Sequence, residues 1–319
     1  MRWAALCVIA GCAFHTHGVT GDGSVDAAID ARADAPTDTG QPIDCMAKWL
    51  DHTIDFDAAQ PITSVNTVAY ERDPYLSRDE RTLYVSTIRT DSLPAGQTDV
   101  YMATRTQLTD SFGPLTKYAV ASTTSGYETK MSVTADGSYL VVGSTQDGGA
   151  GGVDVWEATD TGSGFGALSR THVMMVEDIG NQQDPMISSN GLHLYIAPDS
   201  SGRQILVVAS RASTTANFGA PVAITELNDA IAGTADPTVS DDERVIVFSS
   251  SRTGTGAGDL WYATRSSAAA TWSTPLQVPS LNTLANEGDP HLSSDGCRLY
   301  FDSDRNVTQS WDLFVANAR

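Results

Sequence analysis

The stretch Asp289-Pro-His-Leu-Ser-Ser-Asp-Gly296, followed by Leu299-Tyr-Phe301, decides the fold because versions of it recur along the chain. The other copies begin at Asp73, Lys130, Asp184 and Asp236. Successive copies start 57, 54, 52 and 53 residues apart. A fixed period of this length indicates a repeat architecture.

Each copy contains the signals of a small antiparallel sheet. Its first strand leads into a tight turn rich in Asp, Asn and Gly, residues that tolerate the positive φ of hairpin turns. A second, alternating strand follows, then a third, and an aromatic residue opens a fourth in the copies that have one. Four short strands per period, without helical periodicity between them, predict one blade of a β-propeller.

The two ends of the repeat array predict how the ring closes. The last copy reaches Arg319 after its third strand, without a fourth. Phe56 lies 17 residues before the first copy, as Trp272 lies 17 before the last, and Ser64-Val-Asn66 matches Ser280-Leu-Asn282. We therefore expect the N-terminal strand to complete the last blade and cover its sheet edge. The prediction is an all-β, five-bladed propeller of four-stranded blades. Six blades are the alternative, but residues 46–55 are too few for another blade.

The repeated motif resembles the WD-like propeller repeat of the TolB type. The resemblance rests on Asp-Pro-x-Leu-Ser-x-Asp-Gly, Leu-Tyr-Phe and a later Asp-Leu-Phe or Asp-Leu-Trp, and it covers roughly residues 56–319. The second copy departs from it, with Lys130-Met131 in place of Asp-Pro. TolB-type chains usually have six blades and an extra N-terminal domain, neither of which is evident here. The resemblance therefore implies the fold and does not carry over that family's partners.

The N-terminus has the pattern of an exported lipoprotein. Arg2 and a short apolar stretch precede Ile9-Ala10-Gly11-Cys12, which resembles the bacterial lipobox. We expect a signal peptide over 1–11, an acylated Cys12, a disordered acidic stalk over 12–45 and the propeller over 46–319. An ordinary secretory signal is the alternative. The predicted location is the bacterial cell envelope, at the periplasmic or surface face of the outer membrane.

The charge balance limits the kinds of partner. The 319 residues carry 19 Lys and Arg against 39 Asp and Glu, a net charge of −20. Such a surface repels nucleic acid, whose binding depends on basic residues. We expect a monomer attached to the membrane through its lipid. Calcium suits so acidic a protein, although the sequence identifies no ligand set, and no other cofactor or metal site is predicted.

Two cysteines remain after the signal region. Cys45 precedes the strand that should join the last blade, and Cys297 precedes the second strand of that blade. An exported protein favours disulfides. We predict that these two are bonded, the alternative being two free thiols.

Paired charges recur in the repeats. Four copies carry Asp at the start of the first strand and Arg after the second, at a spacing of sixteen residues in three copies and nineteen in the other. Both members are missing from the second copy. We expect charge-assisted bonds within each blade. The expected pairs are Asp73–Arg89, Asp184–Arg203, Asp236–Arg252 and Asp289–Arg305.

The functional prediction is a binding module for protein or glycan in the cell envelope. Loops of variable length at one rim, at 92–97, 148–152, 253–258 and 306–311, favour an interaction surface. Residues that do not recur between copies mark a candidate ligand face: Glu128, Glu287, Asp302, Asp304 and Trp311. No catalytic residue is assigned.

Two other functions stay open at this point. One is a glycosidase that uses paired carboxylates at the channel mouth. The other is a structural envelope component without a small ligand.

Overall fold

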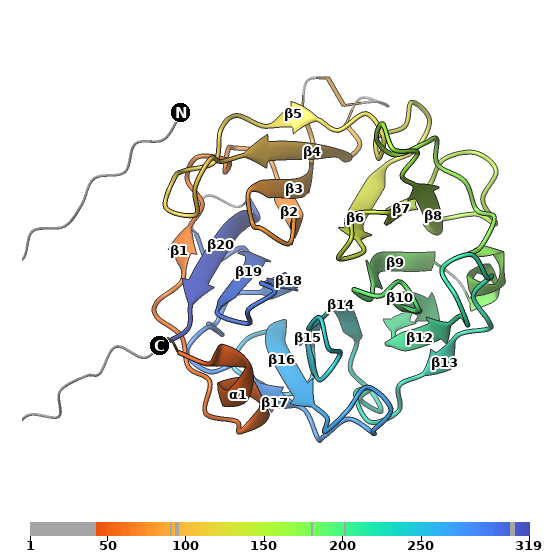
Figure 1. Cartoon of the computed structure of the whole chain (residues 1–319). Helices are drawn as coiled ribbons and strands as arrows, with labels where there is room; N and C mark the ends of the chain where they lie inside the picture. Colours follow the sequence, from red (N-terminus) through yellow and green to blue (C-terminus); the bar gives the residue numbers. More distant parts are fainter. Residues whose placement is uncertain (1–42, 90, 93–95, 180, 201, 307–309) are drawn as a thin grey trace, which may run out of the picture. The chain divides into compact units, whose positions relative to one another are not determined.

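The computed structural model describes residues 43–319 except 90, 93–95, 180, 201 and 307–309. The predicted signal peptide, Cys12 and the stalk up to residue 42 lie outside the described residues. Five antiparallel sheets surround one axis (Figure 1), which confirms the five-bladed propeller. Residues 43–319 form one compact unit.

Each blade runs from an inner strand at the axis to a short outer strand. Blade 1 contains β2 (Glu71–Leu76), β3 (Thr82–Thr87), β4 (Asp99–Thr104) and β5 (Thr116–Lys117). Blade 2 contains β6 (Glu128–Val133), β7 (Tyr139–Ser144) and β8 (Asp154–Thr159), and an isolated bridge between Glu157 and Ser169 marks its outer edge. Blade 3 contains β9 (Asn181–Ile187), β10 (His193–Ser200), β12 (Val207–Ser210) and β13 (Val222–Ala223).

The remaining elements follow the same plan. Blade 4 contains β14 (Thr234–Val239), β15 (Val245–Ser250), β16 (Asp259–Thr264) and β17 (Leu276–Gln277). Blade 5 contains β18 (Glu287–Leu292), β19 (Arg298–Ser303), β20 (Asp312–Asn317) and, from the other end of the chain, β1 (Gln60–Pro61). The short strand β11 (Arg203–Gln204) pairs with the end of β10 in an antiparallel hairpin, and a 3₁₀ helix, η1 (Met174–Ile179), precedes blade 3.

The N-terminal segment completes blade 5, as predicted. In β1, Gln60 pairs with Val315 and Pro61 with Phe314 of β20. Phe56 forms a further bridge with Ala318. The outer edge of β20 is therefore paired rather than open.

A repeated asparagine secures each of three blades from outside. The Asn66 side chain donates to the Leu313 carbonyl and accepts from the Leu313 amide, both at 2.9 Å. Asn228 makes the same pair of bonds with Leu206 in blade 3. In blade 4, Asn282 does so with Leu260. The match between 64–66 and 280–282 in the sequence thus reflects one shared contact.

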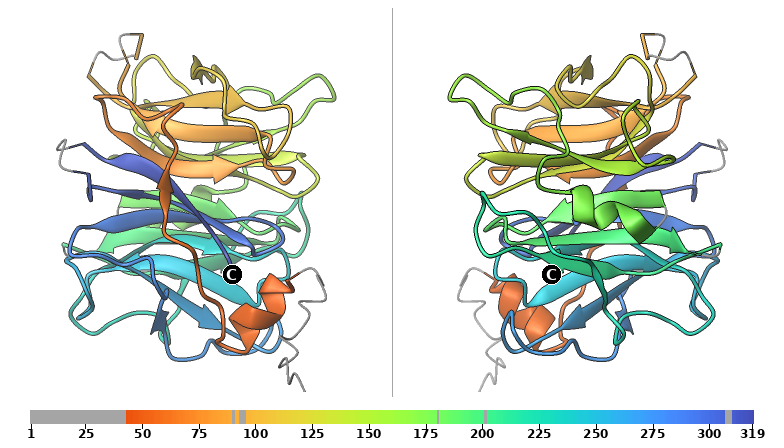
Figure 2. Two further views of the ribbon diagram at one scale, coloured as in Figure 1. Left: turned by 90° about the vertical axis from the view of Figure 1, so that its left-hand side faces the viewer. Right: turned by 90° about the vertical axis from the view of Figure 1, so that its right-hand side faces the viewer.

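A short helix, α1 (Cys45–Leu50), lies at the outer side of blades 4 and 5 (Figure 2). Asp44 caps its N-terminus by accepting from the Ala47 amide at 2.9 Å. Its Trp49 is fully buried beside Tyr262 and donates its indole N–H to the Gly296 carbonyl. The sequence did not predict this helix. Over the described part of the chain, no helix is long and apolar enough to cross a membrane.

The structure joins Cys45 of α1 to Cys297 of blade 5 in a disulfide, with the two Cα atoms 5.2 Å apart. The bond closes a loop that contains blades 1 to 4 and the strands β1 and β18 of blade 5. It lies beside the buried Trp49, so the helix is fixed to the propeller by a covalent bond and by apolar packing.

Candidate functional site

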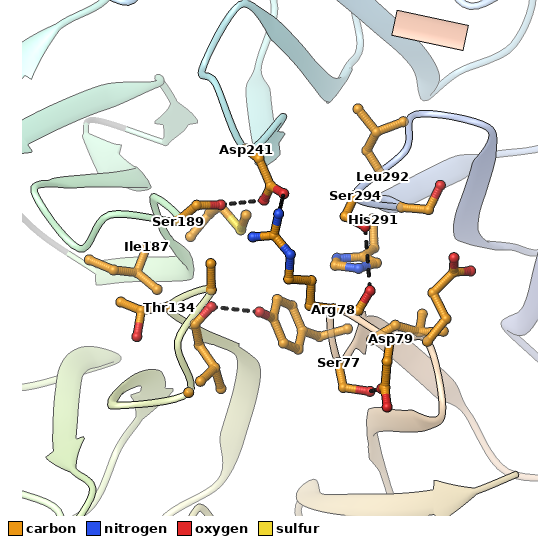
Figure 3. A pocket seen from close by; sticks show the side chains of 18 of the residues that line it. Ser77, Arg78, Asp79, Thr134, Ile187, Ser189, Asp241, His291, Leu292 and Ser294 are labelled. Carbon is orange, nitrogen blue, oxygen red and sulfur yellow. Dashed lines mark hydrogen bonds and ion pairs between the residues drawn. The ribbon is translucent and has the colours of Figure 1, made fainter. Parts of the chain in front are cut away.

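The turns between the first and second strands of the blades converge on the axis at one end of the channel. They surround an open pocket of about 400 Å³, here called the hairpin-end pocket (Figure 3). Its apolar surface comes from several inner strands and includes Tyr75, Met186, Val239 and Leu292. Its polar residues stand on the turns themselves, so one small site draws on all five repeats.

One ion pair spans this pocket. Arg78 of the blade 1 turn reaches across to Asp241 of the blade 4 turn, with Nη2 2.8 Å from Oδ2 (Figure 3). Ser189 of the blade 3 turn also donates to Asp241. The Arg78 side chain is 56% exposed. The pair is therefore accessible to a ligand, and the cost of opening it is small because exposed ion pairs contribute little.

The aromatic side chains of Tyr75 and His291 line the pocket. Tyr75 donates its hydroxyl to the Val133 carbonyl at 2.7 Å and contacts the ring of His291 edge-on, with centroids 4.7 Å apart. Burial, with a smaller effect of Lys130, lowers the pKa of His291 to about 3. The imidazole is therefore neutral near pH 7, and Tyr75 and His291 present a mainly apolar surface.

The turn hydroxyls of the repeats are already occupied by local contacts. In every blade the Ser or Thr at the end of the first strand donates to an Asp or Asn two residues later. These pairs are Ser77–Asp79, Thr134–Asp136, Ser188–Asn190, Ser240–Asp242 and Ser293–Asp295. These bonds, together with backbone N–H groups, lower the pKa of Asp79 and Asp136. Both carboxylates are therefore ionised near pH 7 and stabilise their turns as hydrogen-bond acceptors, which makes them unsuited to act as general acids.

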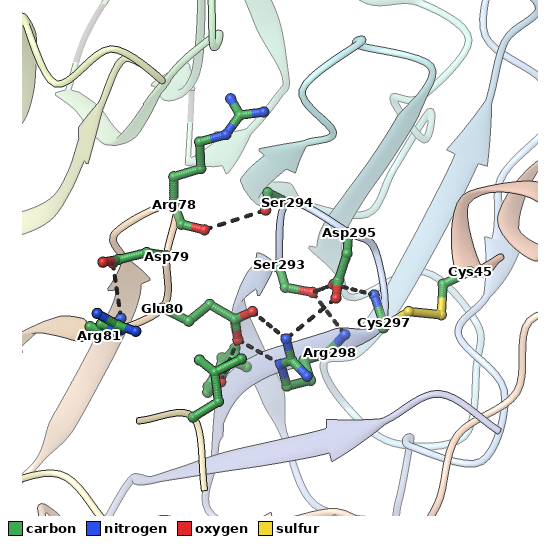
Figure 4. A network of polar contacts seen from close by, with 12 residues as sticks. Cys45, Arg78, Asp79, Glu80, Arg81, Ser293, Ser294, Asp295, Cys297 and Arg298 are labelled. Atoms are coloured by element: carbon green, nitrogen blue, oxygen red, sulfur yellow. Dashed lines mark hydrogen bonds and ion pairs between the residues drawn. A yellow bond between two sulfur atoms is a disulfide. The ribbon is translucent and has the colours of Figure 1, made fainter. Parts of the chain in front are cut away.

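A buried network beside the pocket joins blade 1 to blade 5 (Figure 4). Glu80, on the blade 1 turn, accepts from Arg298 Nε at 2.6 Å and from the Tyr300 hydroxyl at 2.8 Å. Glu243 makes the corresponding contacts between blades 4 and 3, with the Tyr195 hydroxyl at 2.6 Å. The repeated glutamate thus fastens one blade to its neighbour and holds the hairpin turns in place.

The other end of the channel is polar. A cavity of about 400 Å³, here called the channel cavity, is lined by the repeated aspartates Asp73, Asp184, Asp236 and Asp289. Burial raises the pKa of Asp184 and Asp289 well above the usual range, with further contributions from Asp236 and Asp73. These acids therefore repel one another at close range in a poorly solvated place.

The predicted Asp–Arg pairs within blades are wrong, and all eight residues belong to the described part of the chain. Arg305 instead lies 3.1 Å from Glu287, and Arg89 lies 3.8 Å from Glu71. Arg252 donates to Ser250 and to the Leu227 carbonyl. Arg203 donates to the Asp229 carbonyl.

The aspartates point elsewhere because of their backbone conformation. Asp73, Asp184, Asp236 and Asp289 have φ values of 55°, 54°, 55° and 45°. Around all four of them the strand pairing also shifts register. The resulting bulge turns the side chain away from the arginine and into the channel.

Most of the predicted ligand-face residues are buried and serve internal contacts. Glu128 accepts from Thr123 and Glu287 from Thr283 at 2.6–2.7 Å, and both carboxylates are covered. Burial raises the pKa of Glu128 to about 7. They also recur, since Glu71 occupies the same position in blade 1 and bonds Thr67.

The other predicted residues also have partners. Asp302 is fully buried and bonds Arg72 at 2.9 Å. Trp311 stacks on the same guanidinium, 4.5 Å from its ring centroid. Asp304 accepts from the amide and the side chain of Asn286, both at 2.8 Å. The prediction of a ligand face is therefore wrong for Glu128, Glu287 and Asp302, which are buried, whereas Asp304 and Trp311 are half-buried. Of the predicted rim loops, 93–95 and 307–309 lie outside the described residues.

The sequence interpretation missed the hairpin-end pocket, although a signal for it was present. One position after each repeated Ser or Thr, the turns carry Arg78, Ala135, Ser189, Asp241 and Ser294. Opposite charges at two copies of one position suggest that the two residues meet. The predicted charge pairs lie within single repeats, whereas this pair joins blade 1 to blade 4.

No family model matches the chain, and no curated protein matches its sequence. Solved structures share the fold. The catalytic domain of the GH62 α-L-arabinofuranosidase of Coprinopsis cinerea has a TM-score of 0.54 and 14% identity, covering 83% of this chain and 97% of that one. The family 117 glycoside hydrolase Zg3597 of Zobellia galactanivorans has a TM-score of 0.51 and 11% identity, covering 83% and 90%.

A putative TolB from Agrobacterium tumefaciens has a TM-score of 0.45 and 15% identity, covering 79% of this chain and 84% of that one. At identities of 11–14%, the likenesses to the two hydrolases extend to the fold alone.

Proposed function

We propose that this chain is a cell-envelope binding module whose hairpin-end pocket holds a segment of a protein partner. The observation that carries the proposal is the pocket itself, an open, largely apolar cavity with one accessible ion pair across it. Apolar pockets with a few placed polar groups are typical of ligand sites. The Arg78 guanidinium supplies a contact for a carboxylate or a backbone carbonyl of the ligand.

The polar groups of the pocket favour a peptide over a glycan. A sugar needs many free donors and acceptors, and the five turn hydroxyls already bond their own turns. The deep apolar surface around Tyr75 and Met186 suits an aliphatic or aromatic side chain. Glycan is the other ligand class that a module of this fold would take.

The proposed setting follows from the N-terminal sequence. A lipid on Cys12 would attach the chain to the outer membrane, and the acidic stalk would extend the propeller away from it. Labelling cells with a palmitate analogue tests this part. Incorporation that disappears in Cys12→Ala is expected, and equal incorporation in both would contradict it.

Selection of peptides on the purified full chain tests the binding site. Random twelve-residue peptides displayed on phage are the probe, and the selected sequences are then synthesised for titration. We expect the Arg78→Glu variant to bind them at least tenfold more weakly. The matched control is Arg81→Glu, which makes the same charge change on an exposed residue of the same turn outside the pocket.

The proposal fails if the wild-type chain selects no peptides, or if Arg78→Glu and Arg81→Glu bind the selected peptides equally well. Circular dichroism of both variants shows whether the fold is kept. A glycan array run in parallel distinguishes the ligand classes, because binding of sugars alone would replace the peptide proposal.

Glycoside hydrolysis is the second candidate function, favoured by the carboxylates of the channel cavity. The GH62 and family 117 proteins named above are hydrolases on a similar propeller. Release of reducing sugar from a panel of polysaccharides, lost in Asp73→Asn, would establish this activity. No release from any of them would leave the binding function.

A further inference from the structure

The acids of the channel cavity are too many for the cations near them. Asp73, Asp184, Asp236, Asp289 and Asp302 are close neighbours on the axis. The described positive charges beside them are Arg72, which bonds Asp289 and Asp302, and Lys130, which donates to the Pro290 carbonyl at 3.0 Å. Five carboxylates therefore face two cations in a buried place, where unpaired charge is costly.

Three of these acids converge more closely than the rest. Asp73, Asp184 and Asp289 come from blades 1, 3 and 5, and each offers a carboxylate oxygen within 4.8 Å of the other two. Their positive φ values direct all three side chains into the channel. A conformation that is unfavourable for a non-glycine residue, repeated at this position, indicates that the convergence has a use.

Arg72 leaves buried oxygens without a partner. Its guanidinium holds Oδ2 of Asp289 at 3.1 Å and Oδ2 of Asp302 at 2.9 Å. Among the described residues, no N–H or hydroxyl group donates to Oδ1 of Asp289 or to Oδ1 of Asp302, although these side chains are only 1% and 0% exposed, and their polar neighbours there are other carboxyl groups. Buried acceptors are nearly always satisfied in native proteins. An unsatisfied oxygen of Asp289, one of the three converging acids, therefore points to a missing ligand.

We propose that Asp73, Asp184 and Asp289 bind a single Ca²⁺ ion on the axis of the propeller. Oxygen ligands of Ca²⁺ lie about 2.3–2.6 Å from the ion, so two ligands on opposite sides are about 4.6–5.2 Å apart. The three oxygens all lie within 4.8 Å of one another, close enough to reach one such ion together. Mg²⁺ demands a near-ideal octahedron and keeps several water ligands, so a site made of several protein carboxylates suits Ca²⁺ better. The all-oxygen donor set also favours a hard cation over zinc or copper.

The channel cavity gives the ion access and room for water ligands. It opens the acid cluster to solvent at the end of the propeller opposite the hairpin-end pocket. Thr129 also lines it, and its buried Oγ1 has no partner among the described residues. One ion there would join blades 1, 3 and 5, which are not sequence neighbours. The calcium site is thus independent of the proposed peptide site.

Calcium titration of the full chain tests the proposal. Protein stripped with a chelator and desalted is titrated with CaCl₂ and with MgCl₂ by calorimetry, and its thermal midpoint is measured with each ion. We expect one Ca²⁺ per chain, a weaker response to Mg²⁺, and a midpoint raised by about 5–10 °C at calcium a hundredfold above its dissociation constant.

Two variants and a matched control locate the ion. Asp184→Asn and Asp289→Asn should each weaken calcium binding at least tenfold, whereas Asp147→Asn, an exposed acid on a loop, should not change it. In chelator, Asp184→Asn should be at least as stable as the wild type, because it removes a repelling charge. A merely structural aspartate would give the opposite result.

The proposal is overturned if the wild-type chain binds no calcium, if it prefers Mg²⁺, or if Asp184→Asn binds calcium within threefold of the wild type. Asp184 makes no bond to Arg72, so this variant stays informative if Asp289→Asn fails to fold.

Discussion

Replacing Glu80 with Gln should weaken the contact between blade 1 and blade 5, here called the seam, and so lower the stability of the ring. Glu80 is 4% exposed, and its carboxylate accepts from Arg298 and from the Tyr300 hydroxyl of blade 5. The substitution keeps the volume of the side chain but removes its charge and one acceptor oxygen. Arg298 and Tyr300 of blade 5 then lose the charged acceptor that blade 1 supplies to both of them.

The expected loss follows from how deeply this network is buried. Removing one partner of a buried ion pair costs about 3–5 kcal/mol. Arg298 is 23% exposed and keeps a contact with Asp295 at 3.4 Å, which lowers the cost. We therefore expect the free energy of unfolding to fall by about 2–4 kcal/mol, and the thermal midpoint by about 5–15 °C.

Urea unfolding followed by tryptophan fluorescence measures this loss. Glu226→Gln, which changes an exposed acid, is the matched control and should stay within about 0.5 kcal/mol of the wild type. Glu243→Gln at the seam of blades 3 and 4 should cost less than Glu80→Gln, since Glu243 bonds the Tyr195 hydroxyl in the same way but has His193 where Glu80 has Arg298. If Glu80→Gln unfolds like Glu226→Gln, the seam network does not stabilise the fold.

Three further predictions concern the closure and the pocket. Replacing Cys45 and Cys297 with Ser removes a cross-link over 252 residues and should lower the free energy of unfolding by at most about 5 kcal/mol. Adding a reductant should then destabilise the wild type but not this variant, and a reductant-sensitive variant would contradict the prediction. Asn66→Ala should cost about 1–3 kcal/mol in urea unfolding, because two backbone groups of β20 lose their partner, and an unchanged midpoint would count against it. Folding lowers the pKa of His291 from 6.5 to about 3. Between these two pH values the imidazole is protonated in the unfolded chain but neutral in the folded one, so the free energy of unfolding decreases as the pH falls from 6.5 toward 3. Relative to His291→Gln, the wild type should lose about 3 kcal/mol between pH 7 and pH 4, and parallel pH profiles would refute this.

The fold was predictable because its signals are local and repeated. The turn residues after Ser77 and Ser293 specify hairpins in each copy, and the phase of Phe56 relative to the first repeat identifies the missing outer strand. Each copy of the motif is a weak predictor of a blade by itself, but five copies at a similar spacing support the same interpretation even where one of them departs from the motif. The helix α1 was not predictable in this way, because it occurs once and spans only six residues, too few to show a helical pattern of apolar residues.

The side-chain partners were much less predictable. A common spacing of sixteen residues suggested that Asp289 meets Arg305, yet Glu287, two positions earlier, is the residue that the arginine contacts. The positive φ of Asp289 turns its side chain away from Arg305 and leaves Glu287 as the partner. A positive φ at a non-glycine residue is uncommon and is difficult to predict from the sequence. The pair of Arg78 and Asp241 was hidden for a different reason, since its members belong to repeats far apart in the chain.

Closure by β1 has a consequence for the order of biosynthesis. Roughly 250 residues separate β1 from β20, so about 10–50 s of translation pass before the partner of the first strand exists. Until β20 has been synthesised, Gln60 and Pro61 have no strand to pair with, and the blades already made form an open, incomplete ring. A chaperone that shields this early segment would raise the share of molecules that reach the native state instead of pairing with another chain.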